Sequence, residues 1–278
     1  MTEAMSLAGP RPISASAGKA ALNAATKLWF LVAVIGQGMF LFYIARFYGP
    51  STLTGNFQAW RLNKMLIKGY VAGDTAGNLA FAAHVLMAAV VTFGGTLQLV
   101  PQIRARAPAV HRWTGRLFLA TAMAASLAGL YMTWVRRTST GLSAIAISLD
   151  AALILAFAAL AWRMALARDF TNHRRWAMRT FMVANGVWFL RVGFTPLALV
   201  TKVLGGEPSM ASPLFTIWNF GCYLVPLAVL ELYFRAKEKA GPGGQFAMAG
   251  ALVVLTALMS VGVVGAWLGF FAPVLAKL

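Results

Sequence analysis

The stretch SAIAISLDAALILAFAALAWR, residues 143–163, decides the fold class. It is apolar or small throughout, apart from Asp150 within it and Arg163 at its end. At about 1.5 Å of rise per residue, a helix of this length crosses the roughly 30 Å hydrocarbon core of a bilayer. We therefore expect a transmembrane helix here.

Similar apolar runs precede and follow this one. The chain is 60% hydrophobic and 11% charged, whereas a soluble domain carries about 25% charged residues. An all-α protein is therefore expected, a polytopic integral membrane helical bundle. The candidate transmembrane spans are 28–48, 78–100, 115–135, 143–163, 177–200, 214–235 and 246–270.

The net charge of +17 lies mostly at the ends of these apolar runs. That distribution indicates topology signals and contact with anionic lipid headgroups, and it argues against a nucleic-acid partner. More of the Lys and Arg residues fall on the N-terminal side of the membrane. The sequence therefore predicts a multi-pass protein of the cell inner membrane, with its N-terminus cytoplasmic and its C-terminus outside.

A repeated pattern organises the middle of the chain. RWTGR (112–116) and RWAMR (175–179) each follow a basic turn and open an apolar span. This internal repeat predicts two related antiparallel helix pairs that form a four-helix core, 78–200. Residues 1–27 are expected to be a cytoplasmic tail, 28–77 the first helix and a long outer loop, and 201–278 two further helices. The loop is expected to be either a short interfacial helix, with Trp60, Leu62, Met65 and Leu66 on its apolar side, or a plain connector.

Three ionisable residues lie inside spans at similar depth: His84, Asp150 and Arg191. Such residues are costly in a membrane, face the bundle interior and usually pair. We expect Asp150 to pair with Arg191, with His84 nearby, and Asn185 and Trp188 to complete the wall. Two interpretations stay open: an ion pair that fixes helix register, or a ligand-binding or proton-handling site open to the outer face.

At the inner face, His111 and His173 are expected at matching depth on facing helices. They would either ligate one metal ion or one haem b, or only cap helix starts at the membrane interface. Arginines surround them and would bind either haem propionates or lipid phosphates. Only three histidines exist, so one bis-histidine haem is the most that the chain supplies. The arginines in question are Arg112, Arg116, Arg175 and Arg179.

Other signals concern packing. Glu231 is expected to pair with an arginine of the inner face, and Gly265 with Gly269 shows the GxxxG spacing of close helix contacts. Pro196 is expected to kink the fifth span and open space beside Arg191. The single cysteine, Cys222, excludes an intramolecular disulfide.

Three stretches of the chain form a recognisable pattern: AHVLMAAVVTFGGTLQLVPQIR (83–104), HRWTGRLFL (111–119) and NHRRWAMRTFMVANGVWFLRV (172–192). Together they resemble the bacterial predicted membrane protein family named domain of unknown function 2306. The resemblance covers roughly residues 80–200 and departs at Ala177, where the family pattern has methionine. It implies a membrane bundle and assigns no activity, because the family is uncharacterised, although such a bundle is similar at fold level to membrane b-type cytochromes. The family positions are occupied here by His84, Gln98, His111, Arg112, Gly115, Arg116, His173, Arg174, Arg179 and Arg191.

The leading functional hypothesis is a non-catalytic binding or transport-type module, with a buried His/Asp/Arg site and an inner arginine collar for anionic lipid. The alternative is a b-type haem cytochrome that exchanges electrons with a quinone or a partner subunit. A third hypothesis is an accessory subunit in which the polar cluster only fixes packing.

Overall fold

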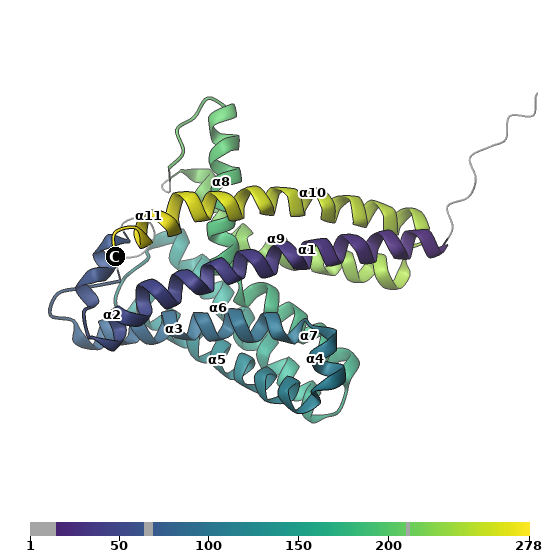
Figure 1. Ribbon diagram of the computed structural model, residues 1–278, viewed down its shortest axis with the longest axis horizontal. Coiled ribbons are helices and arrows are strands. Elements are labelled where there is room, and N and C mark those ends of the chain that lie inside the picture. The colour runs from purple at the N-terminus through teal and green to yellow at the C-terminus, as the bar shows by residue number, and fades with distance from the viewer. Residues whose placement is uncertain (1–14, 64–68, 210–211) are drawn as a thin grey trace, which may run out of the picture.

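The computed structural model describes residues 15–63, 69–209 and 212–278, and the regular elements within these ranges are all helices (Figure 1). In chain order they are α1 (Ala15–Tyr43), η1 (Ile44–Tyr48), α2 (Gly49–Leu53), η2 (Phe57–Leu62), α3 (Thr75–Gln98), α4 (Pro101–Arg106), α5 (Pro108–Trp134), α6 (Gly141–Leu166), α7 (Phe170–Ala184), α8 (Gly186–Val203), α9 (Pro213–Lys239), α10 (Pro242–Ala266), η3 (Trp267–Phe271) and α11 (Ala272–Leu275).

Within the described ranges, seven helical segments are long and apolar enough to cross a membrane. This confirms the all-α, multi-pass membrane bundle. The first segment begins at Ser16, so the part of the expected tail that the structure describes is helical; residues 1–14 lie outside it. The segments are Ser16–Leu53, Thr75–Gln98, Pro108–Trp134, Gly141–Leu166, Gly186–Val203, Pro213–Lys239 and Pro242–Leu275.

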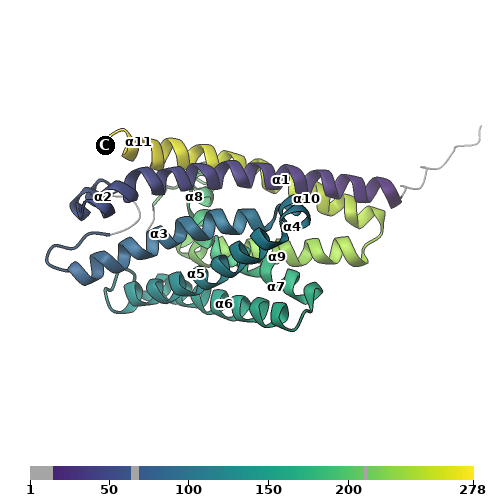
Figure 2. The ribbon, with the colours of Figure 1, turned by 60° about the horizontal axis from the view of Figure 1, so that its bottom comes forward.

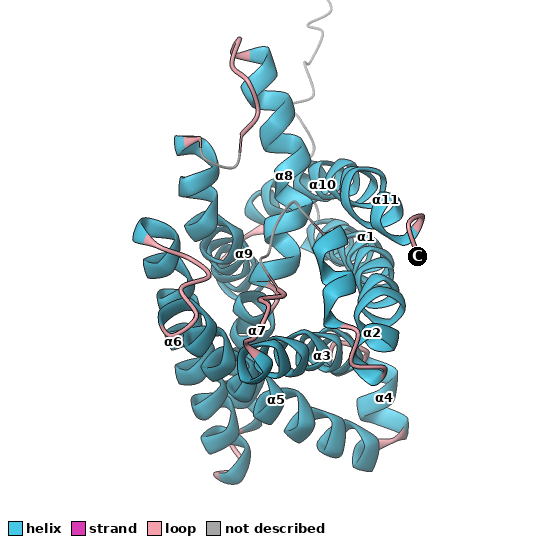
Figure 3. Ribbon diagram, turned by 90° about the vertical axis from the view of Figure 1, so that its left-hand side faces the viewer, coloured by secondary structure: helices cyan, strands magenta, loops and turns pink. Residues whose placement is uncertain are grey.

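Two sets of helices pack closely, and α8 and α9 connect them. Helix α1 lies along α10, while α3, α5, α6 and α7 each pack against the next (Figure 2). Viewed along the helices, α1 and α10 lie on one side of the bundle and α6 on the other (Figure 3). We call the end formed by α4, the first turns of α5 and α7 and the last turn of α9 the basic end. The opposite end, covered by residues 49–63 and 69–74, is the loop end.

Small residues permit the close approach of these helices. Ala146, Ala158 and Ala161 of α6 are completely buried. A Cβ atom at Gly95 of α3 would lie 3.0 Å from the ring of Phe118 on α5 and 3.0 Å from that of a phenylalanine on α7. In lipid, where apolar burial does not drive association, such contacts supply the packing energy.

The fifth predicted span is not one helix. It divides at Asn185, whose ψ of 11° departs from helical geometry, and α8 then runs at a steep angle to α1 and α10 (Figure 1). Helix α8 continues through Pro196, so the expected interruption lies eleven positions earlier than the proline, at Asn185. Asparagine favours such a break because its side chain competes for backbone hydrogen bonds, as Asn185 Nδ2 does with the Phe181 carbonyl at 2.8 Å.

A buried polar network holds this break in place. Gln37 Nε2 of α1 donates to Asn185 Oδ1 at 3.1 Å, and Thr96 Oγ1 of α3 donates to Gln37 Oε1 at 2.5 Å. Gln37 and Asn185 are 2% and 1% exposed. The network therefore ties three helices together at the point where the fifth span bends.

The described part of the loop between the first two spans folds against the bundle. Trp60, on the 3-10 helix η2, is buried, and its Nε1 donates to Ser51 Oγ at 2.7 Å. Its ring centroid lies 5.0 Å from that of Phe81. The prediction of an interfacial helix with Trp60 facing lipid is therefore wrong, because Trp60 packs against aromatic side chains of the bundle. Met65 and Leu66 lie outside the described residues.

The close contact between α8 and α10 is made by Gly262 and Gly265. A Cβ atom at Gly262 would collide with the carbonyl oxygen of Val192, and one at Gly265 with Thr195. Gly269 has open space around it. The packing contact is therefore made by Gly262 and Gly265, and the expected partner Gly269 takes no part.

Candidate functional site

Arg191 is the most unusual charged residue of the bundle. It lies on α8 and is only 6% exposed. Its Nη1 donates to the Val187 carbonyl at 2.8 Å, and its Cζ lies 5.1 Å from the centre of the Phe40 ring. No carboxylate among the described residues pairs with it, and no other acceptor there receives its remaining N–H groups. A buried guanidinium with unused donors is therefore the centre of the candidate site.

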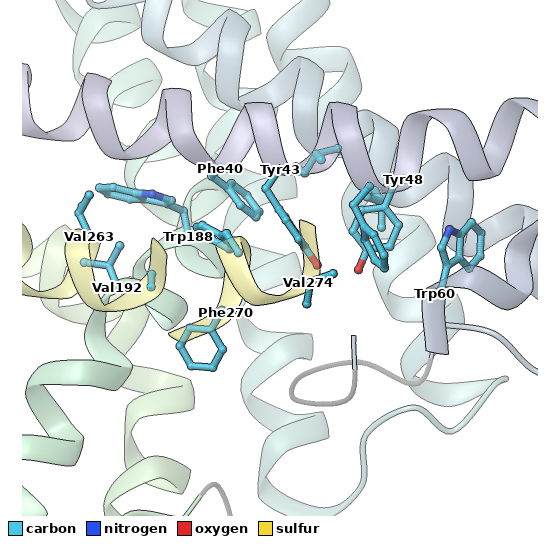
Figure 4. Close-up of a cluster of buried hydrophobic side chains, with 14 of the residues drawn as sticks. Phe40, Tyr43, Tyr48, Trp60, Trp188, Val192, Val263, Phe270 and Val274 are labelled. Carbon is cyan, nitrogen blue, oxygen red and sulfur yellow. The ribbon is translucent and has the colours of Figure 1, made fainter. Parts of the chain in front are cut away.

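Aromatic side chains of α1 and η1 form one wall of this site. Tyr43 and Tyr48 are both buried and lie close enough to Arg191 for electrostatic interaction. Phe40, Tyr43, Tyr48 and Trp60 follow one another toward the loop end (Figure 4). Sequence reasoning missed this wall, because aromatic residues in an apolar span give no sign of which face they occupy.

Helices α1 and α10 each pass into a π-helical turn, and the two chain segments touch there. Tyr43, the last residue of α1, precedes η1, and Phe271 lies in η3; the ring centroids of Tyr43 and Phe271 are 4.8 Å apart. π-Turns are rare and occur frequently at functional sites, because they redirect side chains that a regular helix would space differently. Their position beside Arg191 adds to the case for a site here.

His84 of α3 is brought near Arg191, as expected. Its Nδ1 lies 2.9 Å from the Ala125 carbonyl of α5, and its ring is close enough to Arg191 for electrostatic interaction. The carbonyl can only accept, so Nδ1 carries the proton and Nε2 of the neutral ring is left as an acceptor. Trp188, one turn before Arg191, is 1% exposed and packs between α1 and α10 near Val263 (Figure 4).

Asp150 does not join this cluster, and the expected Asp150–Arg191 pair is wrong. The Asp150 carboxyl lies against Gly186 and Tyr223, with Oδ2 3.0 Å from the Cβ position of Gly186. Gly186 and Arg191 are separated by about 140° around α8, because each residue of an α-helix turns by roughly 100°. Depth in the membrane predicted the pair, but Asp150 of α6 contacts a different face of α8 from the one that carries Arg191.

Asn185 also has another role than the expected one. Both ends of its side-chain amide are used, by the Phe181 carbonyl and by Gln37. It fixes the start of α8, and both the nitrogen and the oxygen of its amide already have protein partners.

The arginines of the basic end divide into two kinds. Arg179 forms two hydrogen bonds with Glu231, at 2.7 and 3.0 Å, and Arg175 forms two with Glu238, at 2.9 and 3.1 Å. The expected pairing of Glu231 is thus confirmed. The first repeat differs: Arg112 and Arg116 are exposed, and the Arg116 Cζ lies 5.0 Å from the Trp113 ring centre.

His111 and His173 lie near each other at the basic end, close enough for electrostatic interaction. The His173 Nδ1 is 2.8 Å from the Ala161 carbonyl, and one terminal atom of the Gln98 amide is 3.0 Å from the His111 Nδ1. Each Nδ1 therefore has a partner, which leaves the two Nε2 atoms. In the described part of the chain, no group of three or more His, Cys, Asp or Glu residues is arranged to hold a metal ion.

A polar clamp closes the loop end. Arg136 Nε, after α5, donates to Asp74 Oδ2 at 2.8 Å, and its Nη2 donates to Asn78 Oδ1 at 3.1 Å. The Gly77 backbone N–H donates to Asp74 Oδ1 at 2.8 Å. The hydrogen bond from Gly77 has the largest effect and the one from Arg136 the next largest, and both lower the pKa of Asp74.

A comparison with protein families identifies the family of this chain. The model of the predicted membrane protein family DUF2306 matches residues 81–234, which is more than half of the chain. The chain belongs to this family. The match runs from His84 and both RWxxR repeats through Arg191 to Glu231 on α9, farther than the resemblance in the three stretches had indicated. No curated protein and no solved structure matched the chain.

Proposed function

We propose that this DUF2306 protein is a non-catalytic binding or transport-type module, in which Arg191 holds the anionic group of a ligand. The observation that carries the proposal is the burial of Arg191 without a carboxylate among the described residues. Burying a charge without a partner costs several kcal/mol, at an order of magnitude, so that a residue used only for packing would be better replaced by an apolar one. Ionisable residues inside membranes mark ligand or ion sites for this reason.

The surroundings of Arg191 favour a carboxylate on an apolar molecule. A guanidinium matches the two oxygens of a carboxylate in geometry and charge. Phe40, Tyr43 and Tyr48 would contact the apolar part, while His84 Nε2 offers a second polar group. Benzoate combines these features in a small probe.

Binding of radiolabelled benzoate to the purified protein tests the proposal. Arg191→Gln should weaken binding roughly tenfold or more, because a charge-assisted hydrogen bond is worth about 1.5–3 kcal/mol. Arg174→Gln is the matched control, since Arg174 is exposed at the basic end. Equal benzoate binding by the wild type and Arg191→Gln, or no binding by either, would contradict the proposal.

Stability gives a second readout of the same variant. If Arg191 serves a ligand, Arg191→Gln should unfold at the same temperature as the wild type or higher, because it removes an uncompensated buried charge. If Arg191 only fixes packing, the variant should unfold at a lower temperature. Thermal unfolding in the same detergent separates the two.

Contact with anionic lipid is proposed for the first repeat alone. Arg112 and Arg116 are exposed beside Trp113, which is 69% exposed, as expected of a membrane–water interface. Arg175 and Arg179 are occupied by carboxylates of α9. Arg112→Gln with Arg116→Gln should lower the binding of anionic lipid from mixed vesicles, whereas Arg175→Gln should lower it less.

A second candidate function rests on His111 and His173. Their proximity at the basic end, with each Nδ1 held by a partner, is the arrangement in which paired Nε2 atoms would hold one haem b. Electron exchange with a quinone or a partner subunit would follow. An absorption spectrum of protein from haem-supplemented cells, oxidised and then reduced, tests this candidate. A Soret band that His111→Ala or His173→Ala removes would support it, and colourless protein would contradict it.

A further inference from the structure

We propose that Asp150 is a proton-binding site inside the membrane, separate from Arg191 and placed where α7 meets α8. The Asp150 Oδ1 is buried without a hydrogen-bond partner. The Oδ2 lies 3.0 Å from the Cβ position of Gly186, the first residue of α8, so any larger residue at position 186 would crowd the carboxyl.

The groups around this carboxyl cannot neutralise it. The Tyr223 and Cys222 side chains of α9 are its titratable neighbours. Tyr223 Oη donates to the Ala146 carbonyl at 3.1 Å, and Cys222 Sγ donates to the Asn219 carbonyl at 3.4 Å. Glycine contributes no side chain from α8, and no Lys, Arg or His among the described residues pairs with Asp150.

A proton is therefore the cation that completes this site. An isolated buried carboxylate is unfavourable, and such a group takes up a proton instead. When Asp150 is deprotonated, the carboxyl O–H bond breaks, the proton passes to water, and a carboxylate remains. The buried carboxyl lies against the start of α8, so we infer that deprotonation moves the start of α8 away from α6, and that movement displaces Arg191 five positions along the same helix. Proton binding at Asp150 and the position of α8 are thus coupled, and the coupling is reciprocal.

Infrared spectroscopy of the full-length protein in lipid at neutral pH tests the proton directly. A protonated carboxyl has a carbonyl stretch separate from carboxylate bands, and the band shifts in deuterium oxide. Asp150→Asn should lose one such band. Asp74→Asn is the matched control and should keep it, because Asp74 is ion-paired with Arg136. An unchanged band in Asp150→Asn would overturn the proposal.

Hydrogen exchange of residues 181–192, read by mass spectrometry, tests the coupling. After correction for base catalysis, the wild type should exchange faster at alkaline pH than at neutral pH, while Asp150→Asn, which stays neutral, should not. Identical pH profiles for the two proteins would overturn the coupling. Neither measurement depends on benzoate binding, so failure here and failure of the anion site at Arg191 are distinguishable.

Discussion

Arg179 of α7 and Glu231 of α9 face each other through two hydrogen bonds, Nε to Oε1 at 2.7 Å and Nη2 to Oε2 at 3.0 Å. The contact decides what the second RWxxR repeat does. Its arginines join α7 to α9, whereas Arg112 and Arg116 of the first repeat remain exposed. The same pattern therefore serves two purposes, because only the second copy has acidic residues beside it.

Glu231→Gln should destabilise the protein by about 1 kcal/mol, since it leaves Arg179 without its charged partner. The effect is modest because the Glu231 side chain is 37% exposed and solvent screens the pair. Thermal unfolding in detergent measures it. Glu207→Gln, on an exposed connecting segment, should leave the unfolding temperature unchanged. Equal shifts for both variants would mean that the pair contributes nothing.

Gly262→Ala should destabilise the bundle by about 1–3 kcal/mol, because the added methyl group collides with the Val192 carbonyl and forces α10 away from α8. Gly269→Ala adds the same methyl group to open space on the same chain segment and should be neutral. Denaturant or heat unfolding of the two variants provides the comparison. A neutral Gly262→Ala would show that α8 and α10 do not approach as described.

Asn185→Leu should cost about 1–3 kcal/mol, because it leaves the buried Gln37 amide without its acceptor. Asn56→Ala is the control, because Asn56 is exposed and makes no side-chain capping bond, and it should leave the unfolding temperature unchanged. Unfolding temperatures of both variants test the expectation. If Asn185→Leu is as stable as the wild type, the hydrogen bond between Gln37 and Asn185 contributes nothing to the stability of the fold.

The Asp74–Arg136 clamp should make stability depend on pH. Because the pKa of folded Asp74 lies below its usual value of 3.8, the clamp contributes fully above that value and is lost as the pH falls through the lowered pKa. The wild type should therefore be more stable than Asp74→Asn at neutral pH, and the difference should shrink in strong acid. Unfolding temperatures across acidic pH measure it. A difference independent of pH would exclude the ionised clamp as its cause.

Much of the fold follows from local pattern. The apolar runs predicted the seven candidate spans, and the acid Glu231 predicted its pairing with an arginine. Both depend on composition and on position along one helix. The division of the fifth span at Asn185 could not be predicted in this way. An asparagine within an apolar run ends a helix only when its side chain finds hydrogen-bond partners such as Gln37.

The candidate site shows the same limit. Depth along the spans placed His84 and Arg191 together correctly, and it placed Asp150 with them wrongly. Depth fixes one coordinate of a residue, whereas the face of the helix depends on how neighbouring helices pack. Gly186, which admits the Asp150 carboxyl, and Phe40, which lies under the Arg191 guanidinium, come from helices whose relation no local pattern encodes.

By itself, the sequence determined that this chain is a multi-pass helical membrane protein and which few residues are ionisable inside it. Those properties arise from hydrophobicity and helix length, which act segment by segment. Only the tertiary structure decided that Arg191 lies among aromatic rings, that Asp150 lies apart from it, and that Arg175 and Arg179 are occupied by α9. Which charges meet depends on helix rotation and on the bend at Asn185, and packing between distant segments sets both.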